Sequence, residues 1–236
     1  MKQAMIFAAG MGTRLKPLTD TMPKALVRVG GQPLLWHVIQ KLKASGYERI
    51  VVNVHHFAQQ IVDYLQTNQN FGLDLRISDE TSQLLETGGG IRKARHLFDP
   101  QSPVLIHNVD ILSNLPLTEL SGDSCTLVVS QRTTKRYLQF DETMRLVGWK
   151  NVETGEVRGR EGRSLAFSGI HVISPALLAL MDAWPERFPI MDFYLSVCAD
   201  QPIYGHEAAG LRLLDVGKLD TLGEAEDFIK TTNFTN

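Results

Sequence analysis

The sequence predicts an α/β protein with three layers, α/β/α, around a mixed, mostly parallel central sheet. Two observations support this prediction. In the first half of the chain, short apolar or β-branched runs alternate with segments whose apolar residues recur at helical spacing. From about residue 120 the pattern changes, and strand-like runs follow one another with short turns. Strand–helix alternation is typical of parallel, doubly wound sheets. The second half adds strands that follow one another without a helix between them.

The first half opens with a buried strand over 4–7 that leads directly into a glycine loop. Apolar spacing indicates a helix over 33–44, which Gly46 ends in the manner of a C-terminal glycine. The further elements expected in this half are strands over 49–54, 73–78 and 104–106, and helices over 57–65 and 90–98. Because ligands bind beyond the carboxyl ends of parallel strands, we expect the polar residues that follow these strands to share one cleft.

The second half is expected to contain more strands than helices. Pro175 occupies the favoured first position of a helix, and the glycine- and charge-rich stretch 148–162 is typical of an exposed hairpin or mobile loop. The remaining elements are strands over 125–130, 137–140, 145–149, 165–173, 203–204 and 211–214, and helices over 191–199 and 219–229. Neither a repeat nor a sharp boundary divides the chain, so one domain over 1–236 is expected.

Composition excludes several classes of function. The chain has 236 residues and a net charge of -2, which gives no overall basic field for nucleic acid. No apolar stretch approaches the ~18 residues that a membrane span requires. The two cysteines, Cys125 and Cys198, lie in apolar surroundings and are expected to be reduced core residues. We therefore expect a cytoplasmic protein that binds neither nucleic acid nor membrane.

The loop after the first strand has the features of a polyphosphate-binding site. It reads Ala8-Ala9-Gly10-Met11-Gly12-Thr13, and its glycines permit unusual backbone angles and a close approach of backbone N–H groups to an anion. Arg14 and Lys24 add positive charge to the same region. No Gly-Lys-Ser/Thr follows, so this is not a P-loop. The sequence predicts a cradle for a triphosphate.

Two acidic residues follow apolar strands at distant points in the sequence. Asp110 ends the run VLIHNVD, and Asp215 ends LRLLD. A carboxylate in such a place can cap the next helix or turn, or it can bind a hard divalent cation such as Mg²⁺. The residues alone leave these two interpretations equally open.

The string from Ala8 to Val29, AAGMGTRLKPLTDTMPKALVRV, resembles the signature of the sugar-1-phosphate nucleotidylyltransferases. The resemblance covers almost the whole chain. It implies a Rossmann-like, GT-A-like nucleotidyltransferase fold, with a nucleotide-binding half over about 1–120 and a sugar-phosphate-binding half over about 121–236. It also implies Mg²⁺ held by Asp110 and Asp215, the second within Asp-Val-Gly. Val109 and Lys218 depart from the usual Gly and Thr.

The resemblance implies a reaction as well. A sugar 1-phosphate attacks the α-phosphorus of a nucleoside triphosphate, and pyrophosphate leaves. Arg14 would hold the pyrophosphate, and Lys24 would contact phosphate near the reacting centre, with Asp110 as the third catalytic residue. The stretch Leu85–Gly90, LETGGG, resembles the base-contacting segment of N-acetylmuramate-1-phosphate uridylyltransferases of cell-wall recycling, which favours UTP. Nucleotide contacts are therefore expected from Glu80, Thr87 and Gly88 besides the residues from Ala8 to Thr13.

The sugar-phosphate side is expected to include Asn151, Ser168, Gly169 and Asp192. Phe167-Ser168-Gly169-Ile170 resembles a family segment whose backbone approaches the sugar. The family often supplies a lysine within Glu-Lys-Pro, and this chain has no such tripeptide. Lys150 is the nearest replacement.

Three other functions stay open at this point. The chain can act as a guanylyltransferase on mannose 1-phosphate, as a cytidylyltransferase on phosphocholine or a similar small phosphate, or as a regulatory nucleotide-binding module without catalysis. The expected partners are a nucleoside triphosphate and a sugar 1-phosphate. A monomer or a small homo-oligomer is expected.

Overall fold

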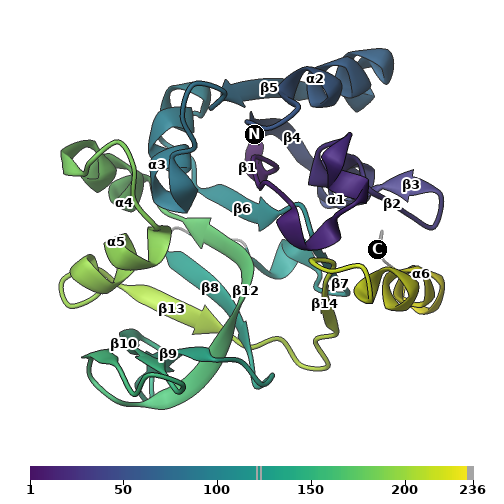
Figure 1. Ribbon diagram of the computed structural model, residues 1–236. Helices are drawn as coiled ribbons and strands as arrows, with labels where there is room; N and C mark the ends of the chain where they lie inside the picture. Colours follow the sequence, from purple (N-terminus) through teal and green to yellow (C-terminus); the bar gives the residue numbers. More distant parts are fainter. Residues whose placement is uncertain (121, 123, 233–236) are drawn as a thin grey trace.

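The protein is described by a computed structural model that covers residues 1–120, 122 and 124–232, and its centre is a ten-stranded mixed sheet with helices on both faces (Figure 1). Along its main path the strand order is β11-β10-β9-β12-β6-β1-β4-β5, and β8 and β13 continue from β12. The expected α/β class and the mixed sheet are confirmed.

The parallel part of the sheet comes from the first half of the chain. It consists of β1 (Lys2–Phe7), β4 (Tyr47–Val54), β5 (Asp74–Asp79) and β6 (Val104–Asn108). The runs expected to be strands over 4–7, 49–54 and 104–106 lie within these elements, and the one expected over 73–78 is shifted by one residue, to Asp74–Asp79. The helices of this half are α1 (Leu34–Ala44), α2 (Ala58–Thr67) and α3 (Glu86–Ala94). Gly46 follows α1 with φ of 81°, which only glycine adopts readily.

The second half adds antiparallel strands through one long strand, β12 (Arg163–Ile173), which pairs with β6. The remaining strands here are β8 (Cys125–Ser130), β9 (Arg136–Phe140), β10 (Leu146–Asn151), β11 (Val157–Gly159) and β13 (Ile203–His206). Strands β10 and β11 form the hairpin expected in 148–162. The helices are α4 (Pro175–Leu180), with its N-terminal proline, and α5 (Ile190–Val197).

Two small sheets complete the fold. One is an antiparallel pair of β7 (Ile111–Ser113) and β14 (Leu213–Asp215), which lies next to α6 (Thr221–Thr231) (Figure 1). The other pairs β2 (Arg28–Val29) with β3 (Gln32–Pro33). Short 3-10 helices span Thr13–Leu15, Leu18–Asp20, Lys24–Leu26, Gln69–Gly72, Arg95–Leu97, Leu117–Leu120 and Met181–Ala183.

Alternating residues of β1 divide the core between the two faces of the sheet. Ala4 and Ile6 belong to a cluster that includes the apolar faces of α1 and α2, whereas Met5 belongs to a cluster with α3, α4 and α5. This arrangement gives the three layers that the sequence predicts. Within the described residues, no helix is long and apolar enough to cross a membrane.

The start of α3 differs from the expectation, and the change between the two halves cannot be compared with it. The helix expected to begin at Gly90 begins at Glu86, so all three glycines of the LETGGG stretch lie inside α3. Glycine is a poor helix former, and the sequence therefore favoured a loop there. The change between the halves, expected at about residue 120, lies next to Ser121 and Asp123, which are outside the described residues.

Candidate active site

A cavity of about 260 Å³ opens at the carboxyl ends of the parallel strands. Seven residues expected at the site line it: Ala8, Ala9, Gly10, Lys24, Glu80, Thr87 and Asp110. The other lining residues are Phe7, Asn53, Leu84, Glu86, Asn108 and Val109. Strand ends that are far apart in sequence therefore contribute to one site, as doubly wound sheets require.

A buried amide holds the start of the glycine loop. The side-chain oxygen of Asn53, at the end of β4, accepts hydrogen bonds from the backbone N–H groups of Ala8 at 2.7 Å and Ala9 at 3.3 Å. The side-chain nitrogen of Asn53 donates to Glu80 Oε1 at 2.8 Å. The loop is thus fixed by a side chain from the neighbouring strand.

Glu80 is fully buried and connects three segments of the site. Besides accepting from Asn53, its carboxylate accepts from the backbone N–H of Leu85 at 3.0 Å. Its backbone carbonyl lies 2.6 Å from His55 Nδ1. A nucleotide contact was expected from Glu80, and that role stays a prediction. The geometry gives this residue a positioning role, because it orients both Asn53 and the segment that leads into α3.

The turn at Gly12 folds the loop back on itself. Gly12 has φ of 63°, and a Cβ there would lie 2.9 Å from Thr19 Cγ2 and 3.0 Å from Lys24 Cβ. The hydroxyl of Thr19 donates to the Gly12 carbonyl at 2.8 Å. Met11 and Thr13 flank this turn and are exposed outside the lining of the cavity. The close packing at Gly12 brings the Lys24 side chain toward the cavity.

The structure brings Asp110 and Asp215 together. The backbone N–H of Val216 donates to the Asp110 carbonyl at 2.8 Å, and Asp215 pairs with Ile111 in the β7–β14 sheet. Lys24 Nζ forms an ion pair with Asp110 Oδ2. A Cβ added to Gly217 would lie 2.6 Å from Arg14 Nη2 and 2.7 Å from Asp215 Oδ1, so these groups are neighbours too.

The charges in this cluster influence one another. Desolvation by the surrounding protein raises the pKa of Asp215, and the negative charge of Asp110 raises it further. Lys24, Arg14 and Arg132 act in the opposite direction. Because the two carboxylates repel each other, an additional positive charge beside them is favourable.

The donor set of this cluster fits Mg²⁺. Both acids offer hard carboxylate oxygens, and Mg²⁺ is commonly held by one or two carboxylates together with substrate phosphates and water. Among the described residues no group of three or more His, Cys, Asp or Glu side chains could enclose a metal ion. A site that is completed by phosphate oxygens therefore matches the residues better than one made of protein ligands alone.

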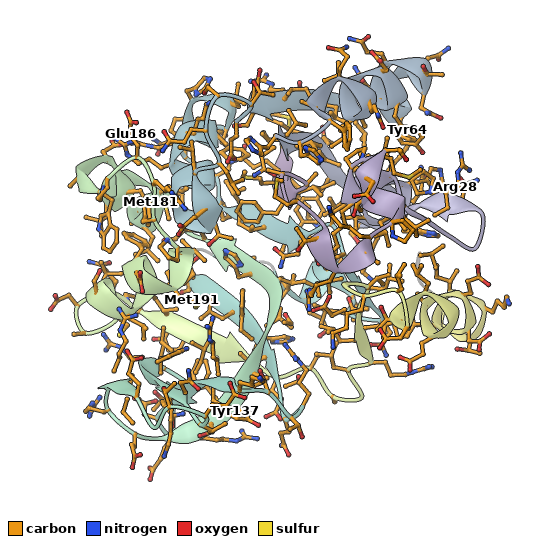
Figure 2. The ribbon with its side chains drawn as sticks, viewed as in Figure 1. Arg28, Tyr64, Tyr137, Met181, Glu186 and Met191 are labelled. Carbon is orange, nitrogen blue, oxygen red and sulfur yellow. The ribbon has the colours of Figure 1, made fainter. Side chains whose placement is uncertain are left out.

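The glycines of α3 are required by packing. A Cβ on Gly88 would lie 2.2 Å from Phe188 Cε2, and one on Gly89 would lie 2.2 Å from the carbonyl of Glu186, which is labelled in Figure 2. The backbone N–H groups of Gly88 and Gly89 both donate to the Phe188 carbonyl, at 2.9 and 3.1 Å. These two N–H groups are already used by the 186–188 segment, and a base contact at Gly88 stays a prediction.

The residues expected on the sugar-phosphate side separate into two groups. Gly169, with φ of 82°, lies against Asn108, because a Cβ there would be 2.6 Å from Asn108 Nδ2. Ser168 is buried beside it, and its hydroxyl accepts from the Ile170 N–H at 3.2 Å. Gly169 therefore lies next to a lining residue, although neither of the two residues lines the cavity itself.

The second group lies on the hairpin and on α5, outside the lining of the cavity. Lys150 is paired with Glu161 at 2.9 Å, and Asp192 with Arg158 at 2.6 Å. The side-chain oxygen of Asn151 accepts from the backbone of the following turn, at Glu153 and Thr154. In this structure all three side chains are engaged with the hairpin or its neighbours.

Sequence reasoning missed Asn53, and it placed Asn108 in the shared cleft only through its position at the end of a strand. Asn53 is the one polar residue in the otherwise apolar run Ile50–Val54, which was a usable signal. A buried amide in such a strand must find partners, so it indicates a structured neighbour. Asn108 ends β6 two residues before Asp110, and its contact with Gly169 depends on long-range pairing that the sequence does not reveal.

Comparison with known proteins agrees with this geometry. The nucleotidyl transferase family model matches residues 3–123. An N-acetylmuramate alpha-1-phosphate uridylyltransferase of Neisseria meningitidis serogroup B is 43% identical over 232 residues, which cover 95% of this chain and 96% of that protein. The protein of the same name from Caulobacter vibrioides is 34% identical over 224 residues, with 89% and 90% covered.

A solved structure extends the comparison to the fold. The inositol-1-phosphate CTP transferase of T. maritima superposes with a TM-score of 0.77 at 16% identity, covering 98% of this chain and 97% of that chain. At this identity the likeness concerns the fold. From the family match, and from relatives that are similar over nearly their whole length, it follows that the chain belongs to the nucleotidyl transferase family of enzymes.

Proposed function

We propose that this enzyme transfers a uridylyl group from UTP to N-acetylmuramate 1-phosphate, releasing pyrophosphate, with Mg²⁺ as cofactor. The observation that carries the proposal is the cluster of Asp110, Asp215, Lys24 and Arg14 beside a cavity bordered by a glycine loop. The choice of UTP and of the acceptor is supported by the names of the two relatives that match almost the whole chain.

The chemistry requires positioning and charge neutralisation. The acceptor phosphate is already ionised, so no strong general base is needed, and two anions must instead be brought together. Bound Mg²⁺ would supply Lewis-acid stabilisation of phosphate oxygens, with Asp110 and Asp215 as its protein ligands. Lys24 would neutralise charge on the reacting phosphates. Arg14 would hold the departing pyrophosphate through its planar guanidinium.

The glycine loop would orient the triphosphate. Gly10 leaves space at the cavity wall, since a Cβ there would meet no atom within 4 Å. The amide of Asn53 fixes the backbone of Ala8 and Ala9 before substrate arrives, which lowers the entropy lost on binding. Thr87 and Glu86, at the other wall, would face the nucleoside.

The experiment is a pyrophosphate-release assay with UTP, GTP and CTP, each combined with N-acetylmuramate 1-phosphate, mannose 1-phosphate and phosphocholine. Release with UTP and N-acetylmuramate 1-phosphate, abolished by EDTA and restored by Mg²⁺, is the expected result. A preference for GTP with mannose 1-phosphate, or for CTP with phosphocholine, would replace the proposal by that alternative. Absence of release with every pair would favour a regulatory binding module.

Two further expectations from the sequence, a cytoplasmic location and a monomeric or small oligomeric state, stay predictions. Light scattering of the same purified enzyme would measure the oligomeric state.

A further inference from the structure

The acceptor phosphate needs a cation that the expected residues do not supply. Lys150, the nearest replacement for the missing Glu-Lys-Pro lysine, forms an ion pair with Glu161 on the hairpin, where their side chains are 37% and 67% exposed. Lys24 contacts Asp110, and Arg14 lies beside Gly217. Because these three cations contact other groups, we expect the cation for the acceptor phosphate near Ser168 and Gly169, on the sugar-phosphate side of the site.

Arg132 lies at this place. It belongs to the loop between β8 and β9, is exposed, and donates from Nη2 to the Phe167 carbonyl at 2.9 Å. Phe167 precedes Gly169 by two residues of β12, at a point where the pairing of β12 with β8 is irregular. Gly169 in turn contacts Asn108, which lines the cavity. This series of contacts connects the guanidinium with the cavity wall, although Arg132 is not itself a lining residue.

The loop that carries Arg132 is anchored on both sides. On one side Gln131 donates to Glu207 at 2.9 Å. On the other, the backbone N–H of Thr134 donates to the hydroxyl of Tyr137 at 3.1 Å, and Tyr137 lies on β9 (Figure 2). An anchored arginine loses less freedom on binding an anion than a free surface side chain does.

The guanidinium has unused donors. An arginine carries five N–H donors, and the Phe167 carbonyl accepts one of them. Among the described residues no carboxylate forms an ion pair with Arg132, whereas Lys150, Arg158 and Arg163 each have such a partner.

From this geometry we infer that Arg132 binds the phosphate of the acceptor sugar 1-phosphate and replaces the family lysine that this chain lacks. The inference rests on the proposed function and assigns the acceptor side of the same site. A planar guanidinium can donate two parallel hydrogen bonds to a phosphate while it keeps its bond to Phe167. The acceptor phosphate would then lie between Arg132 and the two acids.

The test compares Arg132→Ala, Arg132→Lys and the matched control Arg136→Ala by steady-state kinetics in both substrates. Arg136 is an exposed arginine on β9 for which no side-chain partner is found among the described residues. Losing a charged hydrogen bond in Arg132→Ala should raise KM for the sugar 1-phosphate about 10- to 100-fold. KM for UTP should stay within about twofold. Arg132→Lys should recover part of the loss, and Arg136→Ala should match the wild type.

Several results would overturn the inference. These are an unchanged acceptor KM in a folded Arg132→Ala enzyme, a rise confined to the KM for UTP, or an equal rise in Arg136→Ala. Thermal unfolding of each variant shows whether it is folded, and the partial rescue by lysine separates a charge effect from a lost loop anchor. A wild-type enzyme without turnover contradicts the proposed function itself, whereas an active wild type with an unaffected variant contradicts this inference alone.

Discussion

The two ends of the site are built in different ways. At the nucleotide end, Asn53 and Glu80 are buried, and each makes hydrogen bonds to backbone groups of other segments. At the hairpin end, formed by β9, β10 and β11, charged side chains pair with one another at the surface, as Lys150 does with Glu161. Buried polar networks fix a geometry, because leaving any member unsatisfied costs free energy. Exposed ion pairs contribute little and can rearrange.

This difference suggests a division of tasks. In the proposed reaction, the end that would bind the triphosphate requires a fixed arrangement of donors, since the reaction depends on alignment at one phosphorus atom. The hairpin end, with its exposed ion pairs, has no such fixed network. Substitutions at the two ends should therefore have effects of very different size.

The largest effect is expected for Lys24→Ala. It removes the cation next to Asp110 and leaves two repelling carboxylates at the reacting centre, so kcat should fall on the order of 10³-fold. The control is Lys16→Ala in the same segment, whose side chain is 61% exposed in a pair with Asp20. Pyrophosphate release measures both. Wild-type turnover in Lys24→Ala would remove this residue from the mechanism.

Asn53→Ala should be next in size. The substitution leaves Glu80 Oε1 and two loop N–H groups without the partner that Asn53 supplies. This should lower the free energy of unfolding by about 1–3 kcal/mol and raise KM for UTP. Urea unfolding measures the first quantity. Asn68→Ala serves as the control, because its side chain forms an exposed hydrogen bond to Tyr64. Equal losses in both variants would mean that the buried network at the nucleotide end contributes no more than an exposed hydrogen bond.

Asp215→Asn should inactivate the enzyme and yet stabilise the unliganded protein at neutral pH. A carboxyl whose pKa is raised on folding holds its proton more tightly in the folded state, so stability decreases as pH rises from the unfolded to the folded pKa. The asparagine amide does not ionise, so the variant does not lose this stability as the pH rises. Melting temperatures from pH 4 to 8 should show the variant above the wild type, with a gap that closes toward acid pH. A gap that is constant with pH would argue against the charge effect.

The smallest effect is expected for Glu161→Gln, which breaks the exposed pair with Lys150. The free energy of unfolding should change by at most about 0.5 kcal/mol. Urea unfolding at low and high salt checks this value. A salt-sensitive loss above about 1 kcal/mol would mean that the hairpin pair contributes as much as a buried interaction.

Much of the architecture could be predicted from the sequence. The strand runs that became β1, β4 and β6 are short, apolar and followed by polar residues, and the rule for parallel strands was enough to place their ends together. The meeting of Asp110 with Asp215 was implied by the family resemblance, because β14 is antiparallel to β7 in a separate small sheet and the rule for parallel strands does not reach it.

Other features depended on contacts that local pattern cannot reveal. The helical state of Gly88 and Gly89 results from a backbone segment at 186–188 that fits only where side chains are missing, and this contact outweighs the low helix propensity of glycine. Arg132 reaches the site only because its loop meets β12, 35 residues later in the chain. Pairings over such distances are set by the whole fold.

The small β7–β14 sheet has a consequence for synthesis of the enzyme. The residues that line the nucleotide cavity have all emerged by residue 110, whereas the second acid arrives with β14, more than a hundred residues later. Helix α3, which carries two of these residues, packs on the later segment 186–188, so the cavity itself is complete only after that segment has been added. Reactivity is postponed until the last strand has been added.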